Sequence, residues 1–397
     1  MAKWYDAVRC TGCSACAAVC PRQCIRMRPD SEGFLRPSVQ EDRCAQCGLC
    51  EQLCPALRPL APESGPTVAY AGKHRQASVR SRSTSGGVFW LLAQWVLARG
   101  GVVFGAVYAP DFSVVHSRAE SEAELEAMQG AKYAQSNLGD SLQQVKKLLE
   151  EGRYVLFSGT PCQIAGLHAY LGGAHQRLLS VDLICHGVPS PAVWQQYVTS
   201  RSRLDAGGER PDEIRLRSKV TGWSRYSVQF SYPHGSYRRP AGEDPYIRGF
   251  VGDLYLRPSC YDCRYKGIDR LSDFTLGDYW GIWNQLPEFQ DELGVSLVLL
   301  HSPKAAELWR EISPQLEFQP VDPQGAVAEN PAAVASAKAN PNREAFFSRY
   351  RREDFESLVG ELLPVSSSKK RRITWRRICL GVKRRVLIYI KKRRDYD

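Results

Sequence analysis

The chain has 397 residues, of which 43% are hydrophobic and 24% charged, so it can bury a sizeable core and is long enough for two or three domains. Its net charge of +11 comes from one end: residues 369–397 hold 13 Lys and Arg against two Asp, whereas residues 1–368 are neutral. A neutral body argues against a broad nucleic-acid-binding face. The first ten residues lack the apolar region of a signal peptide, and no apolar run reaches the roughly 20 residues that span a bilayer. Fourteen cysteines in such a chain indicate metal ligation in a reducing cytoplasm.

Two cysteine motifs near the start are the most specific pattern in the sequence. CTGCSACAAVCP begins at Cys10 and CAQCGLCEQLCP begins at Cys44, and both have the CxxCxxCxxxCP spacing of a two-cluster bacterial ferredoxin. In that pattern, each 4Fe-4S cluster binds three cysteines of one motif and the last cysteine of the other. The expected ligands are Cys10, Cys13, Cys16 and Cys54 for one cluster, and Cys44, Cys47, Cys50 and Cys20 for the other. Structural zinc and disulfides are the alternatives, but zinc sites usually have two CxxC pairs.

Residues 1–57 are therefore predicted to form a ferredoxin-type module, with GFLRPSV in a β-hairpin, and the Pro-rich residues 58–67 to form a linker. VAYAGKH then predicts a strand, and the loop SRSTSGG leads into an apolar helix. Ser85, Gly86 and Gly87 stand at the start of that helix, where backbone N–H groups can bind a phosphate or a carboxylate. An ordinary helix cap is the alternative interpretation.

The next segments predict an α/β domain. VVFGAVYAP and FSVVHSRA indicate a hairpin, and helices are expected around 121–129 and after GAKYAQS. Two units of buried strand, tight turn and helix follow, with Cys162 after the first strand and Cys185 after the second. Such units predict parallel βαβ structure, in which both cysteines lie at the carboxyl ends of strands, where these sheets bind ligands.

A third metal site is expected from cysteines in the second half. Cys260 and Cys263 form a CxxC pair, and together with Cys162 and Cys185 they provide four thiolates, enough for a third 4Fe-4S cluster. Zinc is the alternative, because four scattered cysteines suit either metal. Cys24 and Cys379 are left over and are predicted not to be ligands.

Seven segments, in order, resemble the coenzyme F420 hydrogenase/dehydrogenase beta-subunit family. They are SGGVFWLLA, GAKYAQS, LFSGTPCQIAGL, DLICHGVPSP, DPYIRGF, LYLRPSCYDC and SDFTLGDYWGI, and the resemblance extends over about residues 68–350. It implies a cytoplasmic iron-sulfur flavoprotein in which electrons pass between the ferredoxin clusters, the third cluster, FAD and a small organic substrate or the deazaflavin coenzyme. A non-catalytic electron-transfer subunit that docks on a partner dehydrogenase is the alternative.

The resemblance also gives roles to single residues. Ser85, Gly86, Gly87, Gly159 and Thr160 are expected to contact FAD, and Lys132 to place a positive charge beside the reduced flavin. Asp278 and Trp280 are expected to bind a hydroxyl group and to stack on a ring, although Trp280 also suits a core position. His186 is the candidate acid or base, with a hydrogen bond to cluster sulfur or backbone as the alternative.

The predicted fold class is an α+β ferredoxin module followed by an α/β flavin-binding domain and a basic C-terminal helix. We divide the family-like region into an N-terminal part at 68–150 and a C-terminal part at 151–364, followed by a basic tail at 365–397. In the tail, apolar residues recur at helical spacing between basic clusters, so it is a candidate for peripheral contact with an anionic membrane. A solvated basic tail is the alternative.

Overall fold

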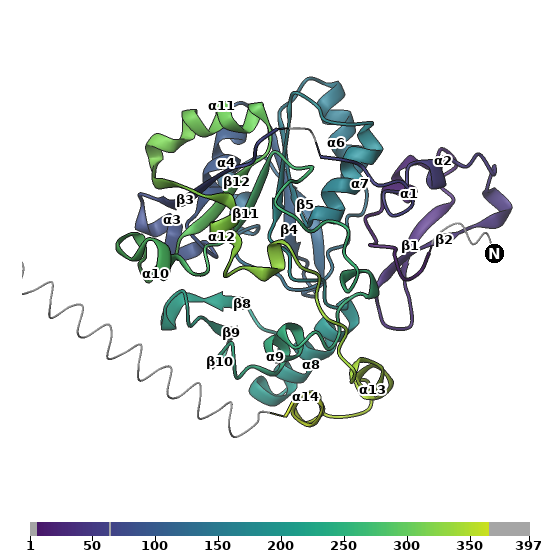
Figure 1. Cartoon of the computed structure of the whole chain (residues 1–397). Coiled ribbons are helices and arrows are strands. Elements are labelled where there is room, and N and C mark those ends of the chain that lie inside the picture. Colours follow the sequence, from purple (N-terminus) through teal and green to yellow (C-terminus); the bar gives the residue numbers. More distant parts are fainter. Residues whose placement is uncertain (1–5, 63–64, 365–397) are drawn as a thin grey trace, which may run out of the picture.

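The computed structural model describes residues 6–62 and 65–364, which form three parts (Figure 1). A small N-terminal module lies beside an α/β body built on an eight-stranded sheet. The third part is a three-stranded sheet with several helices, drawn in the lower half of Figure 1.

The N-terminal module consists of one hairpin and two short helices. Its elements are α1 (Ala15–Val19), β1 (Ile25–Pro29), β2 (Leu35–Val39) and α2 (Leu49–Gln52). The antiparallel pairing of β1 with β2 confirms the predicted hairpin. Ser14 and Gly48 occupy equivalent positions before α1 and α2 and have φ values of 63° and 72°. The left-handed conformation costs a residue with a side chain roughly 1–2 kcal/mol, so the cysteine loop imposes it on Ser14.

The large sheet has the strand order β13-β3-β12-β11-β7-β6-β4-β5. The strands are β3 (Val68–His74), β4 (Val102–Tyr108), β5 (Val114–Ala119), β6 (Val155–Gly159), β7 (Leu178–Leu183), β11 (Phe274–Asp278), β12 (Ser296–Leu300) and β13 (Leu316–Val321). The neighbours β4, β6, β7 and β11 run parallel, which confirms the predicted parallel βαβ structure. Strands β5, β12 and β13 run antiparallel to their neighbours, so the sheet as a whole is mixed. Residues 68–150 and 151–364 both contribute strands to it.

Helices cover both faces of this sheet. They are α3 (Ala77–Arg82), α4 (Val88–Leu97), α5 (Glu122–Glu126), α6 (Ser141–Glu150), α7 (Pro161–Leu171), α10 (Ile282–Gln285), α11 (Pro303–Ile312) and α12 (Pro323–Val327). Val103 of β4 packs with α4, α5 and α11, whereas its neighbours Val102 and Phe104 pack with α6 and α7. Successive strand residues face opposite sides, so the near-continuous apolar strands fit a sheet that is buried on both faces.

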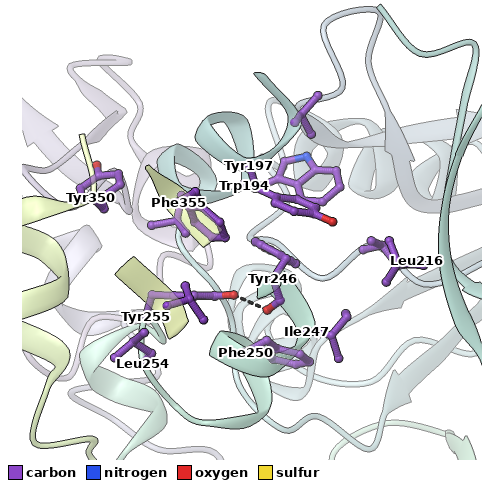
Figure 2. Packing of buried hydrophobic residues seen from close by; sticks show 14 of the residues in the cluster. Trp194, Tyr197, Leu216, Tyr246, Ile247, Phe250, Leu254, Tyr255, Tyr350 and Phe355 are labelled. Atoms are coloured by element: carbon purple, nitrogen blue, oxygen red, sulfur yellow. Dashed lines mark hydrogen bonds between the residues drawn. The ribbon is translucent and has the colours of Figure 1, made fainter. Parts of the chain in front are cut away.

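The third part is held together by aromatic side chains (Figure 2). Its elements are α8 (Pro191–Ala206), β8 (Glu213–Ser218), β9 (Ser227–Tyr232), β10 (Gly235–Pro240), α9 (Pro245–Val251), α13 (Arg343–Arg349) and α14 (Phe355–Leu362). The rings of Tyr197 and Tyr246 stack with centroids 5.0 Å apart, and the Tyr255 hydroxyl donates to the backbone oxygen of Tyr246. These contacts fix α8 and α9 and the segment that leads from α9 to Cys260.

The predicted elements after the module agree with the described structure. The strand at VAYAGKH, the apolar helix after SRSTSGG, the hairpin of β4 with β5 and the helices around 121–129 and after GAKYAQS are all present. Residues 58–62 of the predicted linker form neither helix nor strand. The predicted basic helix at 365–397 lies outside the described residues. Within residues 6–62 and 65–364, no helix is long and apolar enough to cross a membrane.

Candidate functional site

The four cysteines assigned to the first cluster lie together in the module. Burial raises the pKa of Cys13 to about 12, and the charges of Cys10, Cys162 and Cys54 contribute in the same direction. Burial also raises the pKa of Cys16, with added contributions from Cys13, Cys10 and Cys54. Because such effects between thiols act over short distances, Cys10, Cys13, Cys16 and Cys54 form one group, as their spacing predicts.

The second group surrounds an additional cysteine. Cys24 is buried among residues that include Cys20, Cys44 and Cys50, and its Sγ lies 3.3 Å from that of Cys20. Burial raises the pKa of Cys24 to about 11, and its hydrogen bond with Cys20 adds to the effect. Cys47, the remaining expected ligand, is exposed. That Cys24 is not a ligand stays a prediction, while its contact with Cys20 places a fifth thiol at this site.

The third group of cysteines is assembled from distant parts of the chain. Cys162 lies in the first turn of α7 after β6, Cys185 follows β7, and Cys260 and Cys263 lie in and after the short helix Pro258–Cys260. All four line one pocket together with His186. Burial raises the pKa of Cys185, and Cys260, Cys162 and Cys263 raise it further. The two singletons and the CxxC pair are thus brought together at the carboxyl end of the parallel strands.

Several groups around these four thiols favour the thiolate form. The Val188 N–H donates to Cys260 Sγ at 3.3 Å, and Thr160 Oγ1 lies 3.2 Å from Cys162 Sγ. Burial raises the pKa of Cys260 to about 12, but the positive Arg257 acts in the opposite direction. Within residues 6–62 and 65–364, no three His, Cys, Asp or Glu side chains are arranged to hold a single metal ion. In a 4Fe-4S cluster the four thiolates share a larger inorganic core.

The first and third groups are direct neighbours. A Cβ atom at Gly166 of α7 would lie 2.9 Å from Cys13 Sγ, so the module packs tightly on this helix. Burial raises the pKa of Cys162. Burial also raises the pKa of Tyr265, and the charges of Cys162, Cys13 and Cys54 raise it further, so this tyrosine lies beside both groups. The structure therefore brings eight of the twelve expected ligands into one region.

His186 lies at the same pocket and is paired with a carboxylate. Its Nε2 is 2.7 Å from Asp253 Oδ1, and its ring meets that of Phe250 edge-on at 5.1 Å. Asp253 has a φ of 59°, a conformation that is uncommon for residues other than glycine. The contact does not have the geometry of a hydrogen bond, because both atoms are buried without a hydrogen-bond partner among the described residues. An imidazole in this position suits either proton transfer or a hydrogen bond to the site.

The Ser85–Gly87 segment lies at the same edge of the sheet, but two of its hydrogen-bond donors already have protein partners. The Gly86 N–H donates to Ser296 Oγ at 2.9 Å, and Ser85 Oγ donates to the Val295 carbonyl at 2.7 Å. A Cβ at Gly86 would lie 2.2 Å from the Gly72 carbonyl oxygen, so close packing on β3 requires glycine here. In this structure the Gly86 N–H is not one of the free donors that the sequence led us to expect.

Gly159 and Thr160 lie next to the third group of cysteines. The Thr160 N–H donates to Gln163 Oε1 at 2.9 Å, and Gln163 Nε2 donates to Ser136 Oγ at 2.9 Å. This network links the turn after β6 to the GAKYAQS loop, and it fixes the position of Cys162.

Lys132 is a half-buried lysine near the carboxyl end of β4. Its Nζ donates to the Gln129 carbonyl at 2.9 Å and lies 5.6 Å from the centre of the Tyr108 ring. Burial lowers the pKa of Lys132 to about 7. An ammonium group that loses its proton near neutral pH differs from an ordinary surface lysine.

Asp278 and Trp280 belong to a buried cluster of charged and aromatic groups. Asp278 forms an ion pair with Arg217 and accepts a hydrogen bond from Trp223 Nε1 at 2.8 Å. Trp280 stacks on Trp223 with the ring planes 8° apart, so its stacking partner here is a protein side chain. Arg217 also lies over the ring of Tyr226, at 4.3 Å from its centre.

The sequence analysis did not identify Arg217. Burial lowers its pKa, but Asp278, Tyr133 and Tyr226 raise it more strongly, so it stays charged. Its Nε and Nη2 atoms are buried without a hydrogen-bond partner among the described residues. In the alternating pattern EIRLRS of β8, Arg217 falls on the same face as the exposed Glu213 and Arg215. The pattern therefore gives no signal for a buried arginine or for its partner 61 residues away.

Comparisons with known proteins find matches for two parts of the chain. Residues 152–324 match the family described as the C terminus of the coenzyme F420 hydrogenase/dehydrogenase beta subunit, and residues 9–57 match the 4Fe-4S dicluster domain. No curated protein matches the chain. Among solved structures, it is similar to a chain of the F420-reducing NiFe hydrogenase complex from Methanosarcina barkeri, with 14% identity and a TM-score of 0.44 over 76% of this chain and 92% of that chain. Residues 152–324 therefore form a C-terminal domain of the coenzyme F420 hydrogenase/dehydrogenase beta-subunit family, and residues 9–57 form a 4Fe-4S dicluster domain.

Proposed function

We propose that this protein is a cytoplasmic iron-sulfur flavoprotein oxidoreductase. It passes electrons between two ferredoxin-type 4Fe-4S clusters, a third 4Fe-4S cluster, FAD, and a small organic substrate or the reduced deazaflavin coenzyme F420. The observation that carries the proposal is the position of Cys162, Cys185, Cys260 and Cys263 around one pocket directly beside Cys13 of the module. Electron transfer requires redox centres close to one another, and this contact provides a route from the module into the α/β body.

The donor sets fit the iron-sulfur clusters. Twelve cysteines fall into three groups of four, and 4Fe-4S clusters are held by four thiolates. In the third group, the Val188 N–H and the positive charges of Arg257 and Lys266 stabilise negative charge on the ligands. Hydrogen bonds and charge of this kind also set the potential of a bound cluster.

The carboxyl edge of the sheet supports a flavin site. FAD, when bound, would accept electrons singly from a cluster and exchange them in pairs with the substrate. The expected contacts, Ser85–Gly87, Gly159–Thr160, Lys132, Asp278 and Trp280, all lie near this edge, where open α/β sheets bind ligands. The Nε and Nη2 atoms of Arg217 have no hydrogen-bond partner within residues 6–62 and 65–364, so they are buried donors suited to a polar ligand in the same region. Asp278 and Trp280 act here by holding Arg217 and Trp223 in place.

His186 is the proposed proton donor or acceptor. It lines the pocket of the third group, and the Asp253 carboxylate lies 2.7 Å from its Nε2. Phe250 packs against His186 on one side and stacks on Tyr133 at 4.9 Å on the other. The histidine is thus connected by packed rings to the segment that contains Lys132, so a proton and electrons would be delivered in the same region.

The test is anaerobic purification with quantification of iron, sulfide, zinc and flavin, followed by titration with reduced F420 and with reduced ferredoxin. We expect about twelve irons, as three four-iron clusters require, one FAD, and bleaching by one of the two donors. About eight irons with zinc and without flavin would contradict the proposal. Full cofactor content without substrate turnover, together with a dehydrogenase that copurifies in equal amount, would favour the electron-transfer subunit instead.

A further inference from the structure

A buried arginine lies between the first and third groups of cysteines. Arg257 is only 1% exposed and precedes the short helix that ends at Cys260. Its Nη1 donates to the carbonyl oxygens of Cys10 and Leu35, each at 3.3 Å, and its Nη2 also donates to Leu35 at 3.3 Å. The guanidinium group therefore holds two backbone positions of the module from within the α/β body.

The same guanidinium group contacts the module loop closely. A Cβ at Gly12 would lie 2.8 Å from Arg257 Nη2, so only glycine allows the loop between Cys10 and Cys13 to approach so near. The ring of Phe34 lies 4.9 Å from the guanidinium carbon. These contacts leave little freedom in the position of the first group of cysteines relative to Arg257.

Arg257 also lines the pocket of the third group. It shares that pocket with Cys162, Cys185, Cys260 and Cys263. Burial and the nearby Arg36 lower the pKa of Arg257, and the negative groups that raise it are Cys10, Cys260 and Cys162. These cysteines come from both groups, so the arginine lies within electrostatic reach of each.

The charge of Arg257 has no carboxylate partner in the described part of the chain. Its hydrogen bonds go to backbone carbonyls, and it takes part in none of the ion pairs found within residues 6–62 and 65–364. A buried charge without a counter-ion is unfavourable, because the group has lost its hydration. Thiolates, and the electrons that clusters take up, are the negative charge available on either side.

We propose that Arg257 is a positioning residue that fixes the first cluster site against the third and, through its uncompensated charge, favours the reduced state of both. The inference rests on the proposed function, because it requires a cluster at each site. It adds to that function the group that joins the two parts of the electron path.

Arg36 provides a matched control. Its Nη1 donates to the same Cys10 carbonyl at 2.8 Å, and it is also buried, but its charge is paired with Asp30 at 3.1 Å. It is absent from the residues that line the third pocket. Arg36→Gln therefore removes a similar hydrogen bond without removing an unpaired charge between the sites.

The experiment compares the full-length holoprotein with Arg257→Gln, Arg257→Lys and Arg36→Gln by iron content and by redox titration followed by electron paramagnetic resonance. We expect Arg257→Gln to shift the midpoint potentials of the first and third clusters to more negative values. Arg257→Lys should keep potentials near those of the wild type, because it keeps the charge. It should weaken the magnetic interaction between the two clusters, because lysine lacks the planar fork that binds both carbonyls.

Each result has a distinct meaning. Unchanged potentials in Arg257→Gln with full iron content, or an equal shift in Arg36→Gln, would overturn the role of Arg257. If Arg257→Gln loses the third or the first cluster while Arg257→Lys and Arg36→Gln retain both, the positioning role is supported. About eight irons in the wild-type protein, meaning two clusters, would overturn the proposed function and this inference together.

Discussion

Gly166 of α7 lies against Cys13 of the N-terminal module, so close that a Cβ at Gly166 would be 2.8 Å from the Cys13 Cβ and 2.9 Å from its Sγ. This contact brings the first cysteine group next to Cys162 at the start of the same helix. A residue that looks like an ordinary helical glycine in the sequence thus sets the distance between two proposed redox centres.

The first prediction concerns this contact. Gly166→Ala should displace Cys13, destabilise the fold by about 1–3 kcal/mol, as is typical of overpacking, and lower the occupancy of the first cluster. Thermal unfolding and iron content measure the two effects. Gly360→Ala in α14 is the control, because no atom lies within 4 Å of its added Cβ, and there alanine should leave stability unchanged or raise it. Equal behaviour of the two variants would contradict the proposed tight contact.

The second prediction distinguishes cysteines that bind a cluster from cysteines that do not. Cys185→Ser should reduce the iron content from about twelve to about eight, because the third four-iron cluster loses a thiolate. Cys24→Ser should retain about twelve irons, since Cys24 stands outside both motifs. Iron and sulfide analysis of anaerobically purified protein measures both. If Cys24→Ser loses four irons, Cys24 is a ligand and the assignment of the second group must change.

The third prediction concerns proton transfer. His186→Gln should lower substrate turnover about 10²–10⁴-fold, the usual contribution of a general acid or base, while dithionite still reduces the flavin. Asp253→Asn should also lower turnover, because it removes the carboxylate that lies 2.7 Å from the imidazole Nε2. Stopped-flow reduction and steady-state turnover distinguish the steps. Loss of iron in His186→Gln would instead indicate a structural role at the cluster.

The fourth prediction concerns pH and stability. Burial lowers the pKa of Lys132 in the folded protein to about 7, whereas an ordinary lysine has a pKa near 10.4. Between these two pH values the lysine carries a proton in the unfolded chain but not in the folded protein. The cost of burying this lysine is therefore greatest below pH 7 and falls as pH rises. Lys132→Met should be more stable than the wild type at pH 7, and by a smaller margin at pH 9. Thermal unfolding across that range measures the margin, and a margin independent of pH would contradict the lowered pKa.

The sequence by itself determined the parts of the protein that depend on local spacing. The eight ferredoxin cysteines follow from two short motifs, because one loop supplies three thiolates to a cluster. The parallel β6–α7–β7 unit follows from strand, turn and helix in succession, since its hydrophobic pattern changes with each element. The position of Cys162 and Cys185 at strand ends follows from the same pattern.

Only the tertiary structure decided which distant groups meet. Cys185 and Cys260 line the same pocket because the aromatic core of the third part holds the segment after α9 against the edge of the sheet. Arg257 and Cys10, or Arg217 and Asp278, meet through packing between separate parts of the chain. The Gly86 N–H and the Trp280 ring found protein partners that local sequence could not indicate. Contacts of this kind depend on strand order and side-chain packing, and neither leaves a regular spacing in the sequence.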